Sequence, residues 1–218
     1  NINLEIINLI IKKINPMLRW LENMTHENNL FFFNDTCNKI SNNFDILKNY
    51  ANELNIEYFP NLNNDNYIHY FKESGFINCK FNDFRIVFDT GDIGYKFNPG
   101  HAHADCLSFE LIAFNQKIFV NSGISTYENT KLRHFQRSTK SHNTVSINNL
   151  NSSDVWESFR VASVAKSEKD KIKIHQEDNF VEIQSAHSGY SSLLNKIIHK
   201  RNIIIERRKI SIEDSISG

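Results

Sequence analysis

The interpretation of this sequence starts from the run Pro99-Gly100-His101-Ala102-His103-Ala104-Asp105, which continues into Cys106-Leu107-Ser108-Phe109-Glu110-Leu111. In an extended segment, residues two apart share one face, so His101, His103 and Asp105 would project together after a turn at Pro99-Gly100. Burying such polar groups at the start of an apolar strand costs free energy unless they bind a metal or a substrate or belong to a hydrogen-bond network. The alternative is a solvated strand edge that carries two histidines by chance.

The sequence on both sides of this run predicts short strands separated by turn residues. Many closely spaced short strands favour a large antiparallel β-sandwich, which we assign to residues 67–218 and expect to be incomplete at its C-terminus. The expected strands cover residues 69–71, 75–80, 84–89, 106–114, 117–121, 143–147, 159–166, 171–175, 180–185, 197–206 and 209–215.

Residues 1–66 have helical periodicity instead. Apolar residues recur at helical spacing from Leu4 to Ile14, and Pro16 should kink this helix or start a new one. A second helix is expected over residues 36–54, and the polar run 60–66 is the candidate domain boundary. The predicted fold class is therefore an α+β, multidomain chain.

Composition and charge exclude several functional classes. The formal net charge is 0 and no basic cluster marks a phosphate-binding surface, which argues against nucleic-acid binding. No apolar run reaches the length that spans a membrane. The three cysteines lack a C-x-x-C spacing, so we interpret them as small buried residues rather than as disulfides or a zinc knuckle. Since the chain has neither an initiator Met nor a signal peptide, we expect an internal fragment.

Three further stretches carry polar groups that have ordinary explanations when taken singly. The run Asn121-Ser122-Gly123 ends a strand and is usually a turn, His142 at the start of a strand is more often structural, and Trp156 is more often a packing residue than a sugar platform. Two histidines on a strand, one side-chain oxygen and a distant third histidine are, however, typical components of a zinc site. The combination therefore indicates a site more strongly than any one of its parts.

These stretches together resemble a known family. The matching pieces are Gly-His-Ala-His-Ala-Asp with Leu-Ser-Phe-Glu-Leu, then Phe-Val-Asn-Ser-Gly, Arg-Ser-Thr-x-x-His-Asn-Thr-Val and Asp-Val-Trp-x-Ser-Phe-Arg-Val-Ala. With them, residues 100–165 closely resemble the heparinase II/III-like polysaccharide lyases, and Phe32-Phe33-Asn34-Asp35 resembles the end of that family's helical domain. The resemblance implies the end of an α/α toroid, residues 1–66, followed by the β-sandwich.

The resemblance also implies roles for individual residues. His101 matches the active-site histidine that approaches the uronic acid, and His103 matches a ligand of the family's zinc. Asn121 stands where zinc-binding members carry Asp, and His142 stands where the third ligand is expected. Because an Asn oxygen is a weaker ligand than a carboxylate, we expect at most a structural zinc with weak or partial occupancy at His103, Asn121 and His142.

The function implied is a polysaccharide lyase that cleaves an acidic, uronate-containing polysaccharide by β-elimination. A lyase removes the proton α to the uronate carboxylate, so histidine or asparagine donors must neutralise that carboxylate while a base moves the proton. The family's catalytic tyrosine belongs to the toroid and is expected upstream of Asn1, so we expect this fragment to be inactive alone.

Several points stay open at this stage. The alternative function is a non-catalytic glycan-binding or scaffold module with a structural histidine cluster. Heparin-like, alginate-like and bacterial exopolysaccharide substrates all fit, and the sequence does not indicate the oligomeric state. The location implied by the resemblance is the periplasm or cell envelope of a bacterium.

Overall fold

The computed structural model describes residues 3–60, 65–190 and 197–218, which form two compact units. One unit comprises Asn1–Phe31 and Cys37–Asn64, and the other comprises Phe32–Thr36 and Asp65–Gly218. The short segment Phe32–Thr36 thus belongs with the β-rich unit, although it lies within the range that sequence analysis assigned to the helical domain. The run proposed as the domain boundary, 60–66, lies partly outside the described residues.

The first unit contains two helices and a small hairpin. Helix α1 (Leu4–Asn23) continues through Pro16, and helix α2 spans Phe44–Glu53. Leu18 on α1 packs with Phe44 and Ala51 on α2, and this shared apolar core favours an uninterrupted α1 despite the hydrogen bond that proline removes. The hairpin strands are β1 (Thr25–His26) and β2 (Asn29–Leu30).

The second predicted helix, 36–54, begins later than expected. Asn43 is the N-cap of α2, because its side chain accepts a hydrogen bond from the Ile46 backbone N–H at 3.0 Å. Residues 36–43 are therefore not helical.

No helix among the described residues is both long enough and apolar enough to cross a membrane.

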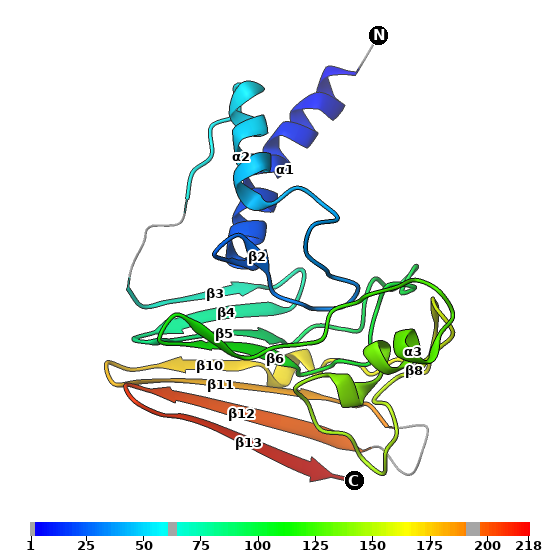
Figure 1. Ribbon diagram of the computed structural model, residues 1–218. Coiled ribbons are helices and arrows are strands. Elements are labelled where there is room, and N and C mark those ends of the chain that lie inside the picture. The colour runs from blue at the N-terminus through cyan, green and yellow to red at the C-terminus, as the bar shows by residue number, and fades with distance from the viewer. Residues whose placement is uncertain (1–2, 61–64, 191–196) are drawn as a thin grey trace. The chain divides into compact units, whose positions relative to one another are not determined.

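The β-rich unit contains two antiparallel sheets (Figure 1). The five-stranded sheet has the order β3-β4-β5-β6-β7, and the four-stranded sheet has the order β10-β11-β12-β13. The strands of the first sheet are β3 (Tyr67–Phe71), β4 (Phe76–Phe81), β5 (Phe84–Asp89), β6 (Phe109–Ala113) and β7 (Gln116–Phe119). The strands of the second are β10 (Lys173–Gln176), β11 (Phe180–His187), β12 (Ile198–Glu206) and β13 (Ile210–Ser217).

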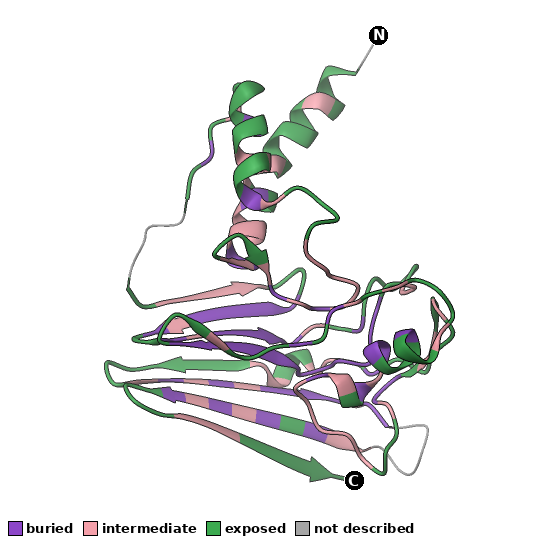
Figure 2. Ribbon diagram, viewed as in Figure 1, coloured by how far each residue is buried: buried purple, intermediate pink, exposed green. Residues whose placement is uncertain are grey.

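The two sheets pack face to face, which confirms the predicted antiparallel β-sandwich. Ile77, Ile86 and Phe88 of the first sheet share one buried core with Ile183 and Ile203 of the second. Figure 2 shows this burial on β4 and β5 and, at alternate positions, on β12. Strict alternation of buried and less buried residues is what a strand with one face on the core requires.

Loops and a short helix occupy one end of the sandwich, where two sequence predictions were wrong. Residues 143–147 form no strand, and residues 106–108 precede the strand that was expected to contain them, since β6 starts at Phe109. Helix α3 (Lys131–Arg137), which the sequence analysis did not predict, lies here with η1 (Thr139–Ser141) and the hairpin β8 (Asp154–Trp156) and β9 (Arg160–Ala162) (Figure 1). A further 3-10 turn, η2 (Lys169–Lys171), precedes β10.

Candidate active site

The segment around the two neighbouring histidines is a turn rather than an extended strand. The Ala102 backbone N–H donates to the Pro99 carbonyl oxygen at 2.8 Å, which closes a tight turn around His101. The His101 side chain is 64% exposed, whereas the His103 side chain is fully buried. The shared face that an extended segment predicts is therefore absent.

One carboxylate nevertheless connects the two histidines. Asp35 Oδ2 lies 2.8 Å from His101 Nδ1, and Asp35 Oδ1 lies 2.8 Å from His103 Nε2. The buried guanidinium of Arg133 donates to both oxygens of the same carboxylate, and it also donates to the Ser158 carbonyl oxygen. Burial alone would raise the pKa of Asp35, but the hydrogen bonds from His103, Arg133 and His101 lower it to about 2. Asp35 is therefore a charged carboxylate whose charge is balanced by these donors, and it holds the His101 ring in place.

Helix α3 supplies two arginines from one face, at positions i and i+4. Arg133 holds Asp35, and Arg137 connects the histidine turn to the β8–β9 hairpin. The Arg137 guanidinium donates to the backbone carbonyl oxygens of Ala102, Trp156, Glu157 and Arg160. Burial and the nearby charge of Arg133 lower the pKa of Arg137 to about 10, so this residue stays charged at neutral pH.

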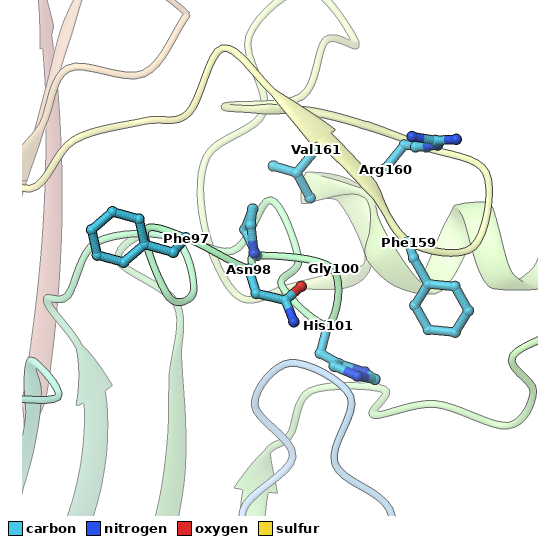
Figure 3. Close-up of a pocket in the computed structure, with 8 residues that line it drawn as sticks. Phe97, Asn98, Gly100, His101, Phe159, Arg160 and Val161 are labelled. Carbon is cyan, nitrogen blue, oxygen red and sulfur yellow. The ribbon is translucent and has the colours of Figure 1, made fainter.

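His101 lies at the edge of an open hollow of about 480 Å³ (Figure 3). The His101 ring packs edge-on against Phe159 and Tyr127, with centroid distances of 5.4 and 5.7 Å. Figure 3 shows Phe159 and the 70% exposed Arg160 projecting to opposite sides of the chain. The hollow is lined by Phe97, Asn98, Pro99, Gly100, His101, Phe159, Arg160 and Val161. It thus offers an exposed imidazole, aromatic surface and a cationic side chain.

His103, His142 and Asn121 form a buried row behind this hollow. His103 Nδ1 lies 3.3 Å from His142 Nε2, and His142 Nδ1 lies 3.1 Å from Asn121 Oδ1. Burial, reinforced by nearby His103, lowers the pKa of His142 to about 3, while the Gln136 carbonyl acts in the opposite direction. Burial likewise lowers the pKa of His103, against the effect of Asp35. Burial therefore favours the neutral form of both imidazoles.

This row does not provide the expected zinc ligands around one point. Two imidazole nitrogens 3.3 Å apart match the spacing of neighbouring ligands on a tetrahedral zinc with bonds of about 2.0–2.1 Å. The Asn121 oxygen, however, lies at Nδ1 of His142, on the other side of that ring from His103. The described part of the chain also contains no group of three His, Cys, Asp or Glu residues that could hold a metal. As arranged, these side chains direct two ligand atoms, and not the expected three, at one point.

Asp105 lies apart from the histidines that it was expected to accompany. Its side chain is buried, and burial together with the charge of nearby Asp89 raises its pKa well above the ordinary value. One of its carboxylate oxygens has no hydrogen-bond partner among the described residues. Asp105 is therefore a buried acid next to Asp89 rather than a member of the exposed site.

Three residues that hold His101 in place, directly or through Asp35, carry little or no recognisable signal in the sequence. Arg133 lies on a helix that was not predicted, and Tyr127 lies in a loop without a recognisable motif. Asp35 lies in the run Phe32-Phe33-Asn34-Asp35, which the sequence places in the helical domain and not beside the histidines. The only sequence signal for Asp35 was the family resemblance of that short run.

The β-rich unit is an antiparallel β-sandwich with a histidine–aspartate site in its end loops. Comparisons of the chain with known protein families identify the family to which it belongs. The model of the family described as "Heparinase II/III-like, C-terminal" matches residues 63–218. The chain therefore belongs to this family, and the resemblance read from its motifs is confirmed. No curated protein matches the chain.

Solved structures share the fold. A crystal structure of heparinase III has a TM-score of 0.69 at 16% identity and covers 95% of this chain. A mutant of the heparan sulfate lyase HepC from Pedobacter heparinus has a TM-score of 0.68 at 16% identity, and it also covers 95% of this chain. The heparinase III BT4657 gene product has a TM-score of 0.66 at 20% identity and covers 93%. The chain spans 34%, 33% and 32% of these proteins, which is about a third of their length.

Proposed function

We propose that this chain is part of a polysaccharide lyase that cleaves a uronate-containing polysaccharide by β-elimination. The observation that carries the proposal is the exposed His101, whose Nδ1 is held by a buried, compensated carboxylate. Membership of the heparinase II/III-like family supports the reaction class. The similar structures are those of heparinases and a heparan sulfate lyase, which favours a glycosaminoglycan or a related acidic polysaccharide as substrate.

The arrangement of His101 suits β-elimination. With Nδ1 directed at Asp35, the opposite nitrogen, Nε2, is available to a ligand in the hollow. As an N–H donor it would neutralise the uronate carboxylate, and as a base it would take the proton from the adjacent carbon. Loss of that proton forms a C=C bond, breaks the bond to the glycosidic oxygen, and leaves that oxygen to take up a proton.

Two side chains that line the hollow, Arg160 and Phe159, and the neighbouring Tyr127 fit an acidic sugar. Arg160 is 70% exposed and forms a distant ion pair with Glu157, at 3.8 Å, so its guanidinium can bind a carboxylate or a sulfate. The rings of Tyr127 and Phe159 lie beside His101 and offer an apolar surface to a sugar ring. The β-rich unit thus contributes one face of a substrate site, and the resemblance assigns the catalytic tyrosine to the toroid.

The test compares His101→Ala with His103→Ala in the full-length protein, because this chain spans about a third of the similar structures. His101→Ala should leave the melting temperature nearly unchanged and lower the rate of unsaturated-uronate formation about 10²–10⁴-fold. His103→Ala should instead lower the melting temperature, because it removes one of the hydrogen bonds to the buried Asp35 and leaves His142 Nε2 without its His103 partner.

The readouts are ultraviolet absorbance of the unsaturated product and thermal unfolding, measured on a panel of acidic polysaccharides. A wild-type rate in a folded His101→Ala protein would refute the catalytic role. If the wild-type protein binds a polysaccharide in the panel without cleaving any, the chain is a glycan-binding module instead.

A further inference from the structure

The buried row behind His101 contains a side-chain atom without a partner. Asn121 is 1% exposed, and its Nδ2 has no hydrogen-bond partner among the described residues, whereas its Oδ1 lies 3.1 Å from His142 Nδ1. A half-turn of an amide group exchanges its oxygen and nitrogen while leaving every other atom in place. The protons on the neighbouring histidines therefore decide which Asn121 atom faces His142.

Those protons follow from the carboxylate at the far end of the row. Asp35 is bound by the Arg133 guanidinium and can only accept, so a neutral His103 must carry its single proton on Nε2, 2.8 Å from Asp35. His103 Nδ1 then has a lone pair, and His142 Nε2, 3.3 Å away, must donate to it. This leaves a lone pair on His142 Nδ1, and the atom facing it must be a donor. Turning the Asn121 amide supplies that donor and gives the unpartnered nitrogen its bond.

A second buried histidine pair in the same unit has the same order of atoms. The Gly189 backbone N–H, which can only donate, lies 2.9 Å from His187 Nδ1. His187 Nε2 lies 3.1 Å from His199 Nδ1, and His199 Nε2 lies 2.6 Å from Asp214 Oδ1. Arg201 donates to both oxygens of Asp214. Here a donor, two histidines, an aspartate and an arginine form a one-way chain in which every Nδ1 accepts and every Nε2–H donates.

The first row matches this second chain atom for atom when Asn121 takes the place of the Gly189 N–H. We propose that Asn121 replaces the metal ion that the family resemblance implies, because its amide donates to His142 and completes a one-way hydrogen-bond chain to Asp35. An aspartate at position 121 cannot donate and would accept from His142 Nδ1–H instead. The lone pairs of His142 Nε2 and His103 Nδ1 would then face each other 3.3 Å apart, and a bound cation or an added proton would remove this repulsion.

The proposal is tested with zinc and chelator on the purified protein and its Asn121→Asp variant. Wild type should retain no zinc after dialysis, and its melting temperature should be the same with zinc and with chelator. Asn121→Asp should melt about 2–12 °C lower in chelator, because two buried acceptors are left facing each other. Zinc should restore its stability, and its zinc affinity should exceed that of wild type about 10–100-fold.

A matched control is Asn78→Asp, which puts the same change at a buried position in the β-sheet, where its side chain contacts Arg85. This variant should not respond to zinc. Nitrogen-15 NMR of the wild-type histidines gives an independent readout that needs no variant to fold. We expect His142 to be protonated at Nε2 and unprotonated at Nδ1.

Two results would overturn the proposal. Stoichiometric zinc in dialysed wild type, with a melting temperature that falls in chelator, would mean that Asn121 does not replace the metal. A proton on His142 Nδ1, donated to the Asn121 oxygen or to the Gln136 carbonyl that also faces this ring, would mean that the chain runs in the opposite direction.

Discussion

Replacement of Arg133 by Met tests the buried charge arrangement that supports His101. The Arg133 side chain is fully buried, and it donates to both Asp35 oxygens and to the Ser158 carbonyl oxygen. Met fills similar volume without donating, so the variant leaves a carboxylate that is 5% exposed without its main counterion. Breaking a buried ion pair by removing one partner costs about 3–5 kcal/mol. For a unit of this size that corresponds to a fall in melting temperature of about 6–20 °C.

The matched control is Arg160→Met, which removes the same group from the surface. Arg160 is 70% exposed and lies 3.8 Å from Glu157, so its loss should cost no more than about 1 kcal/mol. Thermal unfolding followed by circular dichroism measures both variants. Adding Asp35→Asn to Arg133→Met should recover part of the loss, because the uncompensated charge is then gone. Equal melting temperatures for Arg133→Met and Arg160→Met would refute the view that Asp35 depends on Arg133.

Two further predictions concern acid stability and thiol reactivity. Burial, with nearby His199 and Arg201, lowers the pKa of His187 to about 3, so unfolding lets this residue take up a proton below its ordinary pKa of about 6.5. The stability that His187 contributes should fall as the pH drops from about 6.5 towards 3. Urea unfolding measures this, and a midpoint unchanged between pH 7 and 4.5 would contradict the prediction. A midpoint that falls just as far in His187→Gln would contradict it as well. Burial raises the pKa of Cys79 to about 12 and, with nearby Asp89 and Asp105, raises that of Cys106. Iodoacetamide at pH 8 should therefore modify the half-buried Cys37 first in the native protein, and mass spectrometry showing early labelling of Cys79 or Cys106 would be evidence against it.

The β-sandwich could be predicted because its strands alternate between core and solvent. The predicted strand 84–89 coincides with β5, and the predictions at 197–206 and 209–215 differ from β12 and β13 by one or two residues at an end. Period-two patterns reflect burial on one face, which local sequence already encodes. Residues 143–147 have a composition typical of a strand. The side-chain amide of Asn143, however, donates to the backbone carbonyl oxygens of Phe109 and Val120, and the segment is a loop. Such bonds to distant backbone cannot be deduced from a local pattern.

The site was less predictable than the fold, because its parts come from distant segments. The histidine run was conspicuous, but Asp35 is 66 residues away from His101 in the chain, and Arg133 is 98 residues away from Asp35. Helix α3 has only seven residues, and its inward face carries two arginines and a glutamine. A short helix with a polar buried face gives no amphipathic signal, since the arginines are buried for their hydrogen bonds and not for their apolar surface.

The exposed and buried members of this site have separate tasks. His101 faces the hollow while His103 is buried, and the position of His101 depends on Asp35, which is held by Arg133 and by His103. His103 is in turn held by His142, so a change at the far end of the row reaches His101 only through the position of one carboxylate. Substitutions in the row should therefore alter stability and the orientation of His101 together, whereas substitution of His101 itself should alter the reaction alone. The same separation explains how the row can keep its geometry with an amide at position 121 instead of a metal ligand, because the row has to hold Asp35 and does not line the hollow beside His101.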